Sequence, residues 1–336
     1  MSVGLGFGGS PLGVPPSAVP DGGSDLAGRL RERDLAAAPA VLNLVENRAP
    51  AQREKIAALL AGVSPAALGG EAPAHLVGVT GPPGAGKSSL LSELVREWRA
   101  RERSVAVLAV DPSSKRSGGA LLGDRARIVV DPADTSVFIR SMAAGGRLGG
   151  LAPATRAAAH ALAAAFDVVV IETVGVGQSE TEVAEVADTV AVVVQPGSGD
   201  TLQFLKSGIM EIPDVLVVAK ADLGPVALRS RRDLNAALRS LGARDTRVLA
   251  VSSLAPASGF GELVQALDEH RERLDVPARR LAARRASALA DFTAEHGERG
   301  LRALGGRRAA LKLLDERDPA LDVPALTRAL ADKATA

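Results

Sequence analysis

The chain has 336 residues, and its 40 basic and 39 acidic side chains leave a formal net charge of +1. This balance provides no field for nonspecific binding of nucleic acid, and six Phe, one Trp and no Tyr provide no platform for stacking bases. The absence of cysteine excludes disulfides, iron–sulfur clusters and thiolate zinc sites.

The first 24 residues are rich in Gly, Pro and Ser and contain neither Lys nor Arg. We expect residues 1–24 to form a flexible tail, because a secretory signal needs a basic start followed by an apolar stretch. No apolar run in the sequence reaches the roughly 18 residues that a membrane-spanning helix requires. The expected protein is therefore cytoplasmic, with neither a membrane nor a nucleic acid among its partners.

Residues 25–72 are predicted to form a helical N-terminal segment. Apolar side chains recur there every three or four positions, as they do on one face of a helix. Pro39 and Pro50 divide the segment into two or three helices. The repeating apolar residues are Leu26, Leu30, Leu35, Val41, Leu42, Val45, Ile56, Leu59 and Leu60.

Between residues 73 and 270, short apolar runs rich in β-branched residues alternate with helical segments. Most runs are continuously apolar, which is typical of parallel strands covered by helices on both faces. We predict a doubly wound α/β domain with a mostly parallel sheet. The predicted strands lie at residues 76–80, 105–110, 137–142, 168–172, 189–195, 215–220 and 248–252.

Residues 271–336 contain no further strand pattern and are predicted to form two or three helices. Their arginines are interpreted as solvated helix faces, because acidic residues are interleaved with them further along. These arginines are Arg279, Arg280, Arg284, Arg285, Arg307 and Arg308. The histidines show no metal-ligand spacing and are interpreted as ordinary surface or core residues; they are His75, His160, His270 and His296.

The strongest motif is GPPGAGKSS at residues 81–89, which matches the P-loop pattern G-x-x-x-x-G-K-[ST]. It has the expected context of a strand before it and an apolar helical pattern after it. Glycines allow a tight turn whose backbone N–H groups face an anion, and the helix N-terminus adds its dipole. The predicted phosphate-binding residues are Gly81, Pro82, Pro83, Gly84, Ala85, Gly86, Lys87, Ser88 and Ser89.

A Mg²⁺ site also needs carboxylates, and three acidic residues lie at or just beyond ends of predicted strands. Asp111 follows the run at 105–110, Glu172 ends the run at 168–172, and Asp124 lies in the glycine-rich stretch beyond Asp111. Open α/β sheets bind ligands at the carboxyl ends of their strands. The predicted metal ligands are Ser88, Asp111, Asp124 and Glu172.

Lys87 is predicted to reach the β and γ phosphates while Ser88 binds Mg²⁺. Gly175, three residues beyond Glu172, can bring its N–H close to a γ phosphate. Water attack on the β–γ linkage of GTP is the predicted reaction, and Gln178 is a candidate for orienting that water. The predicted catalytic residues are Lys87, Asp111 and Glu172.

The sequence Ala219-Lys220-Ala221-Asp222 follows a buried strand at the position where GTPases usually have Asn-Lys-x-Asp. The Asp222 carboxylate can accept hydrogen bonds from N1–H and the exocyclic amine of guanine. Adenine does not offer this pair of donors. The stem of Lys220 is predicted to cover the base plane. Backbone N–H groups of Ser252, Ser253 and Leu254 are predicted to face the guanine carbonyl.

Five segments together resemble the MeaB/ArgK family of P-loop GTPases, which includes the methylmalonic aciduria type A protein. The N-terminal helical stretch around LVEN (44–47) is also similar, so that the resemblance covers about residues 25–330. The five segments are GPPGAGKSS (81–89), VDPSSKRSGGALLGDR (110–125), IRSMAAGGRLGGLA (139–152), ETVGVGQSE (172–180) and QPGSGDTLQFLKSGIMEI (195–212).

The resemblance implies a GTPase that binds a cobalamin-dependent acyl-CoA mutase, gates the loading of adenosylcobalamin and protects the mutase from inactivation. It places Asp111, Asp124 and Glu172 around Mg²⁺ and the γ phosphate. It makes the segment from Gln195 to Lys206, which contains Asp200, an additional switch loop responding to nucleotide and partner. It further implies a homodimer joined by the helices of residues 271–336.

Three features depart from the family pattern. Ala219 replaces the usual Asn of the base-reading motif, Arg147 replaces an expected His, and residues 271–336 contain few of the family's aromatics.

Alternative functions remain at this level. A metallochaperone GTPase would normally carry Cys or clustered His, which this chain lacks. An ATP-dependent kinase of the ArgK type would need an arginine-bearing lid and an acceptor pocket. A purely regulatory binding module would use the same loops as the mutase-associated GTPase.

Overall fold

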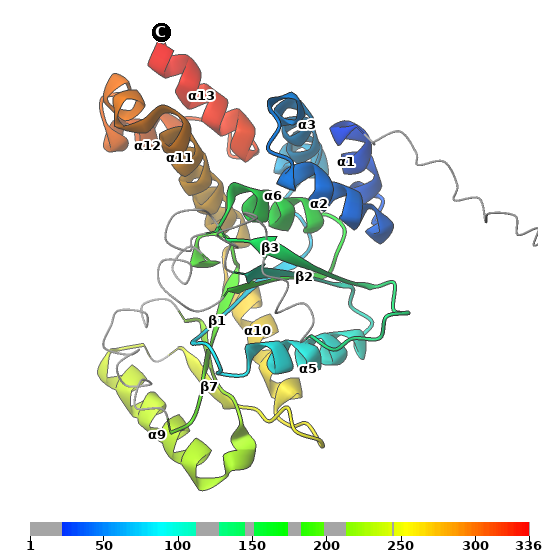
Figure 1. Ribbon diagram of the computed structural model, residues 1–336. Coiled ribbons are helices and arrows are strands. Elements are labelled where there is room, and N and C mark those ends of the chain that lie inside the picture. The colour runs from blue at the N-terminus through cyan, green and yellow to red at the C-terminus, as the bar shows by residue number, and fades with distance from the viewer. Residues whose placement is uncertain are drawn as a thin grey trace, which may run out of the picture.

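The computed structural model describes residues 22–111, 128–144, 151–173, 183–197, 213–243 and 245–335. Its centre is a sheet of seven parallel strands in the order β3-β2-β4-β1-β5-β6-β7 (Figure 1). Each strand overlaps one of the predicted apolar runs. The strands are β1 (His75–Thr80), β2 (Val105–Asp111), β3 (Val137–Ala143), β4 (Val168–Thr173), β5 (Thr189–Val194), β6 (Val215–Val218) and β7 (Arg247–Ala250).

Helices cover both faces of the sheet, which explains why its strands are apolar on both sides. One face packs against α5 (Lys87–Arg99) and α10 (Phe260–Arg273). The opposite face packs against α6 (Pro153–Leu162), α9 (Pro225–Ser240) and the N-terminal helices. In Figure 1, α6 and α2 lie above β2 and β3, whereas α5 lies below them. The predicted P-loop NTPase fold, a doubly wound α/β domain, is confirmed.

The N-terminal helices are α1 (Gly23–Arg31), α2 (Ala38–Glu46), α3 (Arg53–Gly62) and α4 (Pro65–Leu68), with short 3₁₀ turns η1 (Leu35–Ala37) and η2 (Pro50–Gln52). Pro39 and Pro50 lie in first turns, where a missing N–H costs nothing. Most of the apolar residues predicted from periodicity are buried on α1, α2 and α3, including Leu26, Leu42 and Leu59, whereas Leu35 in η1 and Ile56 on α3 are partly buried.

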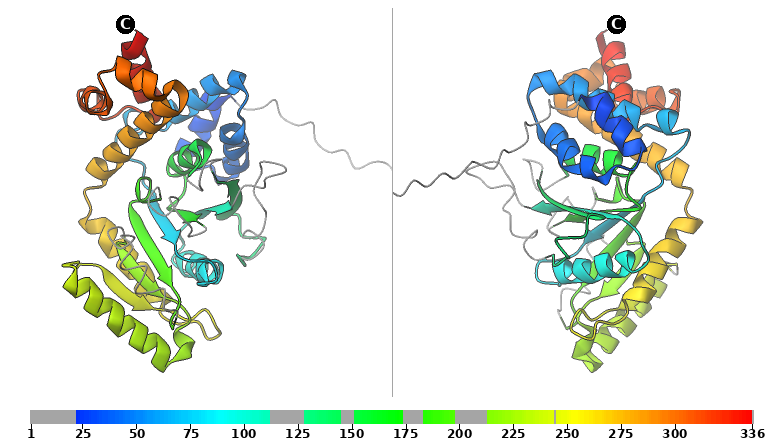
Figure 2. Two further views of the ribbon diagram at one scale, coloured as in Figure 1. Left: turned by 60° about the vertical axis from the view of Figure 1, so that its left-hand side comes forward. Right: turned by 90° about the vertical axis from the view of Figure 1, so that its right-hand side faces the viewer.

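The C-terminal region contains α11 (Val276–Ala303), α12 (Arg307–Asp315) and α13 (Val323–Thr335), which share a separate apolar core around Phe292. A kink at Gly297 divides α11, because that residue has φ of 60° and ψ of −165°. Both views of Figure 2 place these helices beside the N-terminal ones, and α9 at the opposite side of the molecule. Across the described ranges, no helix has the length and apolar character needed to cross a bilayer.

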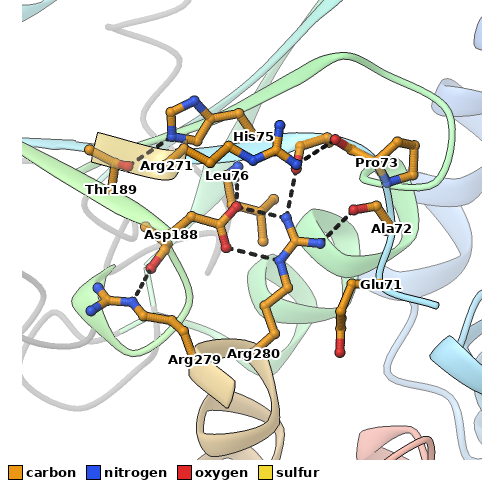
Figure 3. Close-up of polar contacts among 12 residues, drawn as sticks. Glu71, Ala72, Pro73, His75, Leu76, Asp188, Thr189, Arg271, Arg279 and Arg280 are labelled. Carbon is orange, nitrogen blue, oxygen red and sulfur yellow. Dashed lines mark hydrogen bonds and ion pairs between the residues drawn. The ribbon is translucent and has the colours of Figure 1, made fainter. Parts of the chain in front are cut away.

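The arginines of α11 correct a prediction made from sequence. Arg280 and Arg284 are only 3% and 6% exposed, so they are not solvated helix faces. Arg280 forms an ion pair with the fully buried Asp188 and also donates to the carbonyls of Ala72 and Ala74 (Figure 3). The interleaving of charges missed this, since the partner lies 92 residues away in the chain.

Candidate nucleotide-binding site

The phosphate loop leaves the carboxyl end of β1, between the neighbouring strands β4 and β5. The chain winds toward β2 on one side of β1 and toward β5 on the other, and such a switch point is where open α/β sheets bind ligands. Gly81 has φ of 140°, and a Cβ there would lie 2.1 Å from the Val193 carbonyl oxygen. Only glycine permits so close an approach of two backbones.

Lys87 begins α5 and lies almost buried beneath the loop, with 7% of its surface exposed. Its Nζ donates to the Gly81 carbonyl at 2.8 Å and to the Pro82 carbonyl at 3.3 Å. Ser88 follows in the first turn of α5, and its carbonyl accepts a hydrogen bond from Ser92 Oγ at 3.1 Å. An ammonium group and a hydroxyl thus lie together at a helix N-terminus, which is an arrangement suited to a phosphate anion.

Glu172 lies on β4 in register with Val79 of β1 and Ala109 of β2, and is only 2% exposed. The next residue, Thr173, donates from its hydroxyl to Thr80 Oγ1 at 2.8 Å. This buried bond ties the ends of β4 and β1 together just before the phosphate loop. Sequence reasoning missed the hydroxyl pair, although a threonine at the end of each of two strands was a usable signal.

Asp111 ends β2, but its side chain is outside the description, as are the whole of Asp124 and Gly175. Among described residues, no group of three or more His, Cys, Asp or Glu is placed to hold a metal. Ser88, in the first turn of α5, and Glu172, near the end of β4, nevertheless offer a hydroxyl and a carboxylate. Hard oxygen donors of this kind fit Mg²⁺, which usually takes one or two carboxylates and completes its shell with water and phosphate.

The predicted base-reading loop lies beside the phosphate loop. Lys220 follows β6 with a positive φ of 54°, and its Nζ donates to the Gly84 carbonyl at 3.3 Å. The methyl group of Ala219 lies 4.0 Å from the position that a Cβ on Gly86 would occupy. The two motifs, more than a hundred residues apart in sequence, are therefore brought together at the carboxyl edge of the sheet.

Asp222 lies in the 3₁₀ turn η5 (Ala221–Leu223), where it is exposed. Its Oδ1 accepts a hydrogen bond from the buried Ser252 hydroxyl at 2.8 Å. The Ser252 N–H donates to the Ser258 carbonyl, and the Leu254 N–H donates to Ser252 Oγ at 3.3 Å. Ser253 is half-buried in the same loop, whereas Leu254 is 65% exposed.

Gln195 was predicted only as the start of a switch loop, and its contact with the base-reading loop was not predicted. It directly follows β5, and its Oε1 accepts a hydrogen bond from Lys220 Nζ at 2.9 Å. A polar residue immediately after a buried strand was the available signal. The predicted partner and water-orienting residues Gln178, Asp200 and Lys206 fall outside the described ranges.

These features define a nucleotide-binding protein of the P-loop class. A family model for "Methylmalonyl Co-A mutase-associated GTPase MeaB" matches residues 35–298. The chain therefore belongs to the MeaB family of P-loop GTPases, as the resemblance implied.

Individual relatives agree with the family match. A candidate GTPase of Pyrococcus abyssi is 44% identical over 259 residues, which cover 75% of this chain and 76% of that protein. GTPase ArgK of Escherichia coli is 41% identical over 199 residues, or 58% of each chain. A crystal structure of a protein named LAO/AO transport system kinase superposes with a TM-score of 0.63 at 28% identity, covering 94% of this chain and 98% of that one.

Proposed function

We propose that this GTPase serves a cobalamin-dependent acyl-CoA mutase such as methylmalonyl-CoA mutase. In this role it gates the loading of adenosylcobalamin and protects the mutase from inactivation, in the cytoplasm. The observation that carries the proposal is the family match, which spans both the phosphate loop and the base-reading loop and whose description names the mutase association.

Nucleotide binding is proposed to begin with an exchange of partners at Lys87. Its Nζ now donates to two loop carbonyls, and it would transfer those hydrogen bonds to β- and γ-phosphate oxygens. The N–H groups of residues 84–89 would surround the same oxygens. Ser88 and Glu172, with Asp111 and Asp124, would hold Mg²⁺, which when bound neutralises charge between the β and γ phosphates.

In the proposed reaction, water attacks the γ phosphorus in line with the bridging β–γ oxygen. The bond from the γ phosphorus to that oxygen breaks, GDP leaves, and the water oxygen remains on inorganic phosphate with its proton passing to phosphate or solvent. Lys87 stabilises negative charge that develops on the transferred group. Asp111 and Glu172 are proposed to act beside it, and Gln178 to orient the water.

Guanine selection is assigned to Asp222, with Lys220 covering the base plane. The Ser252 hydroxyl supports this role, since its bond to one carboxylate oxygen fixes the direction of the other. Because Ala219 supplies no amide, selection depends on these two side chains and on the loop of Ser252, Ser253 and Leu254.

Partner control is assigned to the stretch after β5, which contains Asp200 and Lys206. A homodimer joined through residues 271–336 would present two such stretches. We expect slow hydrolysis by the isolated protein and faster hydrolysis when the partner orders the loops.

Single-turnover GTP hydrolysis with and without purified methylmalonyl-CoA mutase tests the proposal. Acceleration by the mutase, together with capture of the GTPase on immobilised mutase, is the expected result. Equal rates and no capture would contradict the mutase association and leave only the GTPase.

The kinase alternative rests on the name of the structural neighbour, LAO/AO transport system kinase. Calorimetric titration with GDP and ADP, each with Mg²⁺, separates the two functions. Preference for GDP supports base reading by Asp222. Equal or tighter ADP binding, together with a phosphorylated acceptor trapped from [γ-³²P]ATP, would favour the kinase.

A further inference from the structure

The base-reading loop has lost the side-chain amide that usually anchors it. Ala219 is 4% exposed, and its methyl group packs in the same apolar cluster as Ala85 of the phosphate loop. A methyl group can fill this space but can form no hydrogen bond there. Another contact must therefore hold the position of Lys220 relative to the phosphate loop.

Gln195 occupies the place from which such a contact can be made. Strands β5 and β6 are neighbours with Val194 opposite Val218, and the Ala219 N–H continues the ladder by donating to the Val194 carbonyl at 3.0 Å. Gln195 and Lys220 consequently leave the sheet side by side. The Gln195 carboxamide oxygen accepts from Lys220 Nζ at 2.9 Å, and the same Nζ donates to the Gly84 carbonyl at 3.3 Å.

We infer that Gln195 is a positioning residue of the base site, which holds the Lys220 side chain across the phosphate loop in place of the missing amide. The carboxamide oxygen is a neutral acceptor, so it orients the ammonium group without removing its charge. Three loops, after β1, β5 and β6, are thereby joined through one lysine. The inference rests on the base-covering role proposed for Lys220.

A second contact extends the link to the chain beyond Gln195. The Gly197 N–H donates to Ser230 Oγ of α9 at 3.4 Å, and the Val226 side chain lies 3.2 Å from where a Cβ on Gly197 would be. Helix α9 begins three residues after Asp222. Gln195 and Gly197 are thus held by Lys220 of the base-reading loop and by Ser230 of α9.

The test compares Gln195→Ala and Gln195→Glu with the wild type, using calorimetric binding of GDP and of inorganic pyrophosphate. Gln265→Ala is the matched control, because Gln265 also makes a side-chain hydrogen bond but lies on α10, where it contacts Glu269. Loss of one hydrogen bond to a charged group predicts that Gln195→Ala weakens GDP binding about 5- to 10-fold. Pyrophosphate affinity should change less than about twofold, because the phosphate loop itself is intact.

Rescue distinguishes positioning from a merely structural role. Gln195→Glu keeps an acceptor for Lys220 and should restore GDP affinity to within about threefold of the wild type. Adding Ala219→Asn to Gln195→Ala returns an amide to the loop and should recover part of the loss. In turnover, Gln195→Ala should raise KM for GTP and leave kcat within about twofold, since the bond acts on binding and not on the reacting atoms.

Thermal unfolding first establishes that each variant is folded. If the double variant Gln195→Ala with Ala219→Asn does not fold, the rescue by Gln195→Glu alone tests the inference. GDP binding by Gln195→Ala within twofold of the wild type would overturn the inference, and so would an equal loss for pyrophosphate. A wild-type protein that does not prefer GDP to ADP would instead remove the base-reading roles themselves, and this inference with them.

Discussion

Charged side chains have different roles at the two ends of the parallel strands, which form the carboxyl edge and the amino edge of the sheet. At the carboxyl edge, Lys87, Lys220 and Asp222 lie beside glycine-rich turns, where a ligand can exchange with their present partners. At the amino edge, aspartates immediately before strands are committed to permanent contacts. Charged residues alone therefore do not reveal a functional site; the availability of their hydrogen-bonding groups does.

The amino edge repeats one device at three strands. Asp167, Asp188 and Asp214 precede β4, β5 and β6, and each accepts a backbone N–H from the neighbouring strand or the residue preceding it, at 2.8 or 2.9 Å. Each also contacts a basic side chain from outside the sheet: Arg33 at 2.6 Å, Arg280 at 2.7 Å and His270 at 3.2 Å. The row thus attaches the N-terminal and C-terminal helices to the sheet.

The electrostatics of this edge follow from burial and pairing. Burial alone would raise the pKa of Asp188, but the hydrogen bond and charge of Arg280 outweigh it and lower that pKa below its usual range. Burial likewise opposes ionisation of Asp268, yet the nearby His75 ring and the hydrogen bond from Arg103 lower its pKa to about 2. These carboxylates remain charged at neutral pH and hold their partners.

The largest expected effect is a loss of stability when the ion pair at the amino edge is removed. Arg280→Ala leaves Asp188 buried without its ion pair and should lower the free energy of unfolding by about 3–5 kcal/mol. Arg285→Ala is the control on the same helix, because its ion-pair partner Asp315 is 65% exposed and the pair should be worth about 1 kcal/mol or less. Urea unfolding measures both, and equal losses would show that Arg280 is not a special anchor.

The next effect concerns the carboxyl edge. Lys87→Ala removes the ammonium group from the phosphate loop and should reduce kcat for GTP about 100- to 1000-fold. Lys333→Ala, at an exposed position in the last turn of α13, is the control. If Lys87→Ala retained wild-type turnover, the phosphate loop would not be the site of hydrolysis.

Asp222→Asn tests the base-reading assignment. An amide in place of the carboxylate loses one acceptor for guanine, and GDP affinity should fall by about 10-fold or more. Binding of xanthosine diphosphate should improve, because xanthine carries a carbonyl where guanine carries the exocyclic amine. Asp233→Asn, exposed on α9, serves as the control, and an unchanged preference for GDP in Asp222→Asn would remove the assignment.

The smallest expected effect is on the pH dependence of stability, and it concerns His160. Burial, together with the charges of Arg280 and Arg284, lowers the pKa of His160 to about 4. In the unfolded chain this histidine binds a proton near its ordinary pKa of about 6.5, whereas in the folded chain it stays neutral down to about pH 4. The free energy of unfolding therefore falls as the pH drops from about 6.5 to about 4. His75, whose pKa burial also lowers, contributes in the same direction.

His160→Gln should leave stability at about pH 7 little changed and remove about 1 kcal/mol of the loss between about pH 7 and pH 5. Urea unfolding at the two pH values measures the difference. His296→Gln, on the exposed side of α11, is the control, and identical pH dependence in His160→Gln and the wild type would contradict the assignment.

Much of the fold was predictable because its signals are local. Short apolar runs mark each strand, and the apolar spacing of residues such as Leu26 and Leu42 marks the N-terminal helices. The phosphate loop was predictable for the same reason, since GPPGAGKSS carries its chemistry within nine consecutive residues. For Gly81 the structure adds the reason that it is glycine, which is its close approach to Val193.

The sequence by itself therefore determined the parallel sheet, the phosphate loop and the family of this GTPase, because each depends on neighbours along the chain. Only the tertiary structure decided that Gln195 contacts Lys220 and that Arg280 is buried against Asp188. Those pairs are separated by 25 and 92 residues. Strand order and helix packing bring them together, and no local pattern encodes which distant residues will meet.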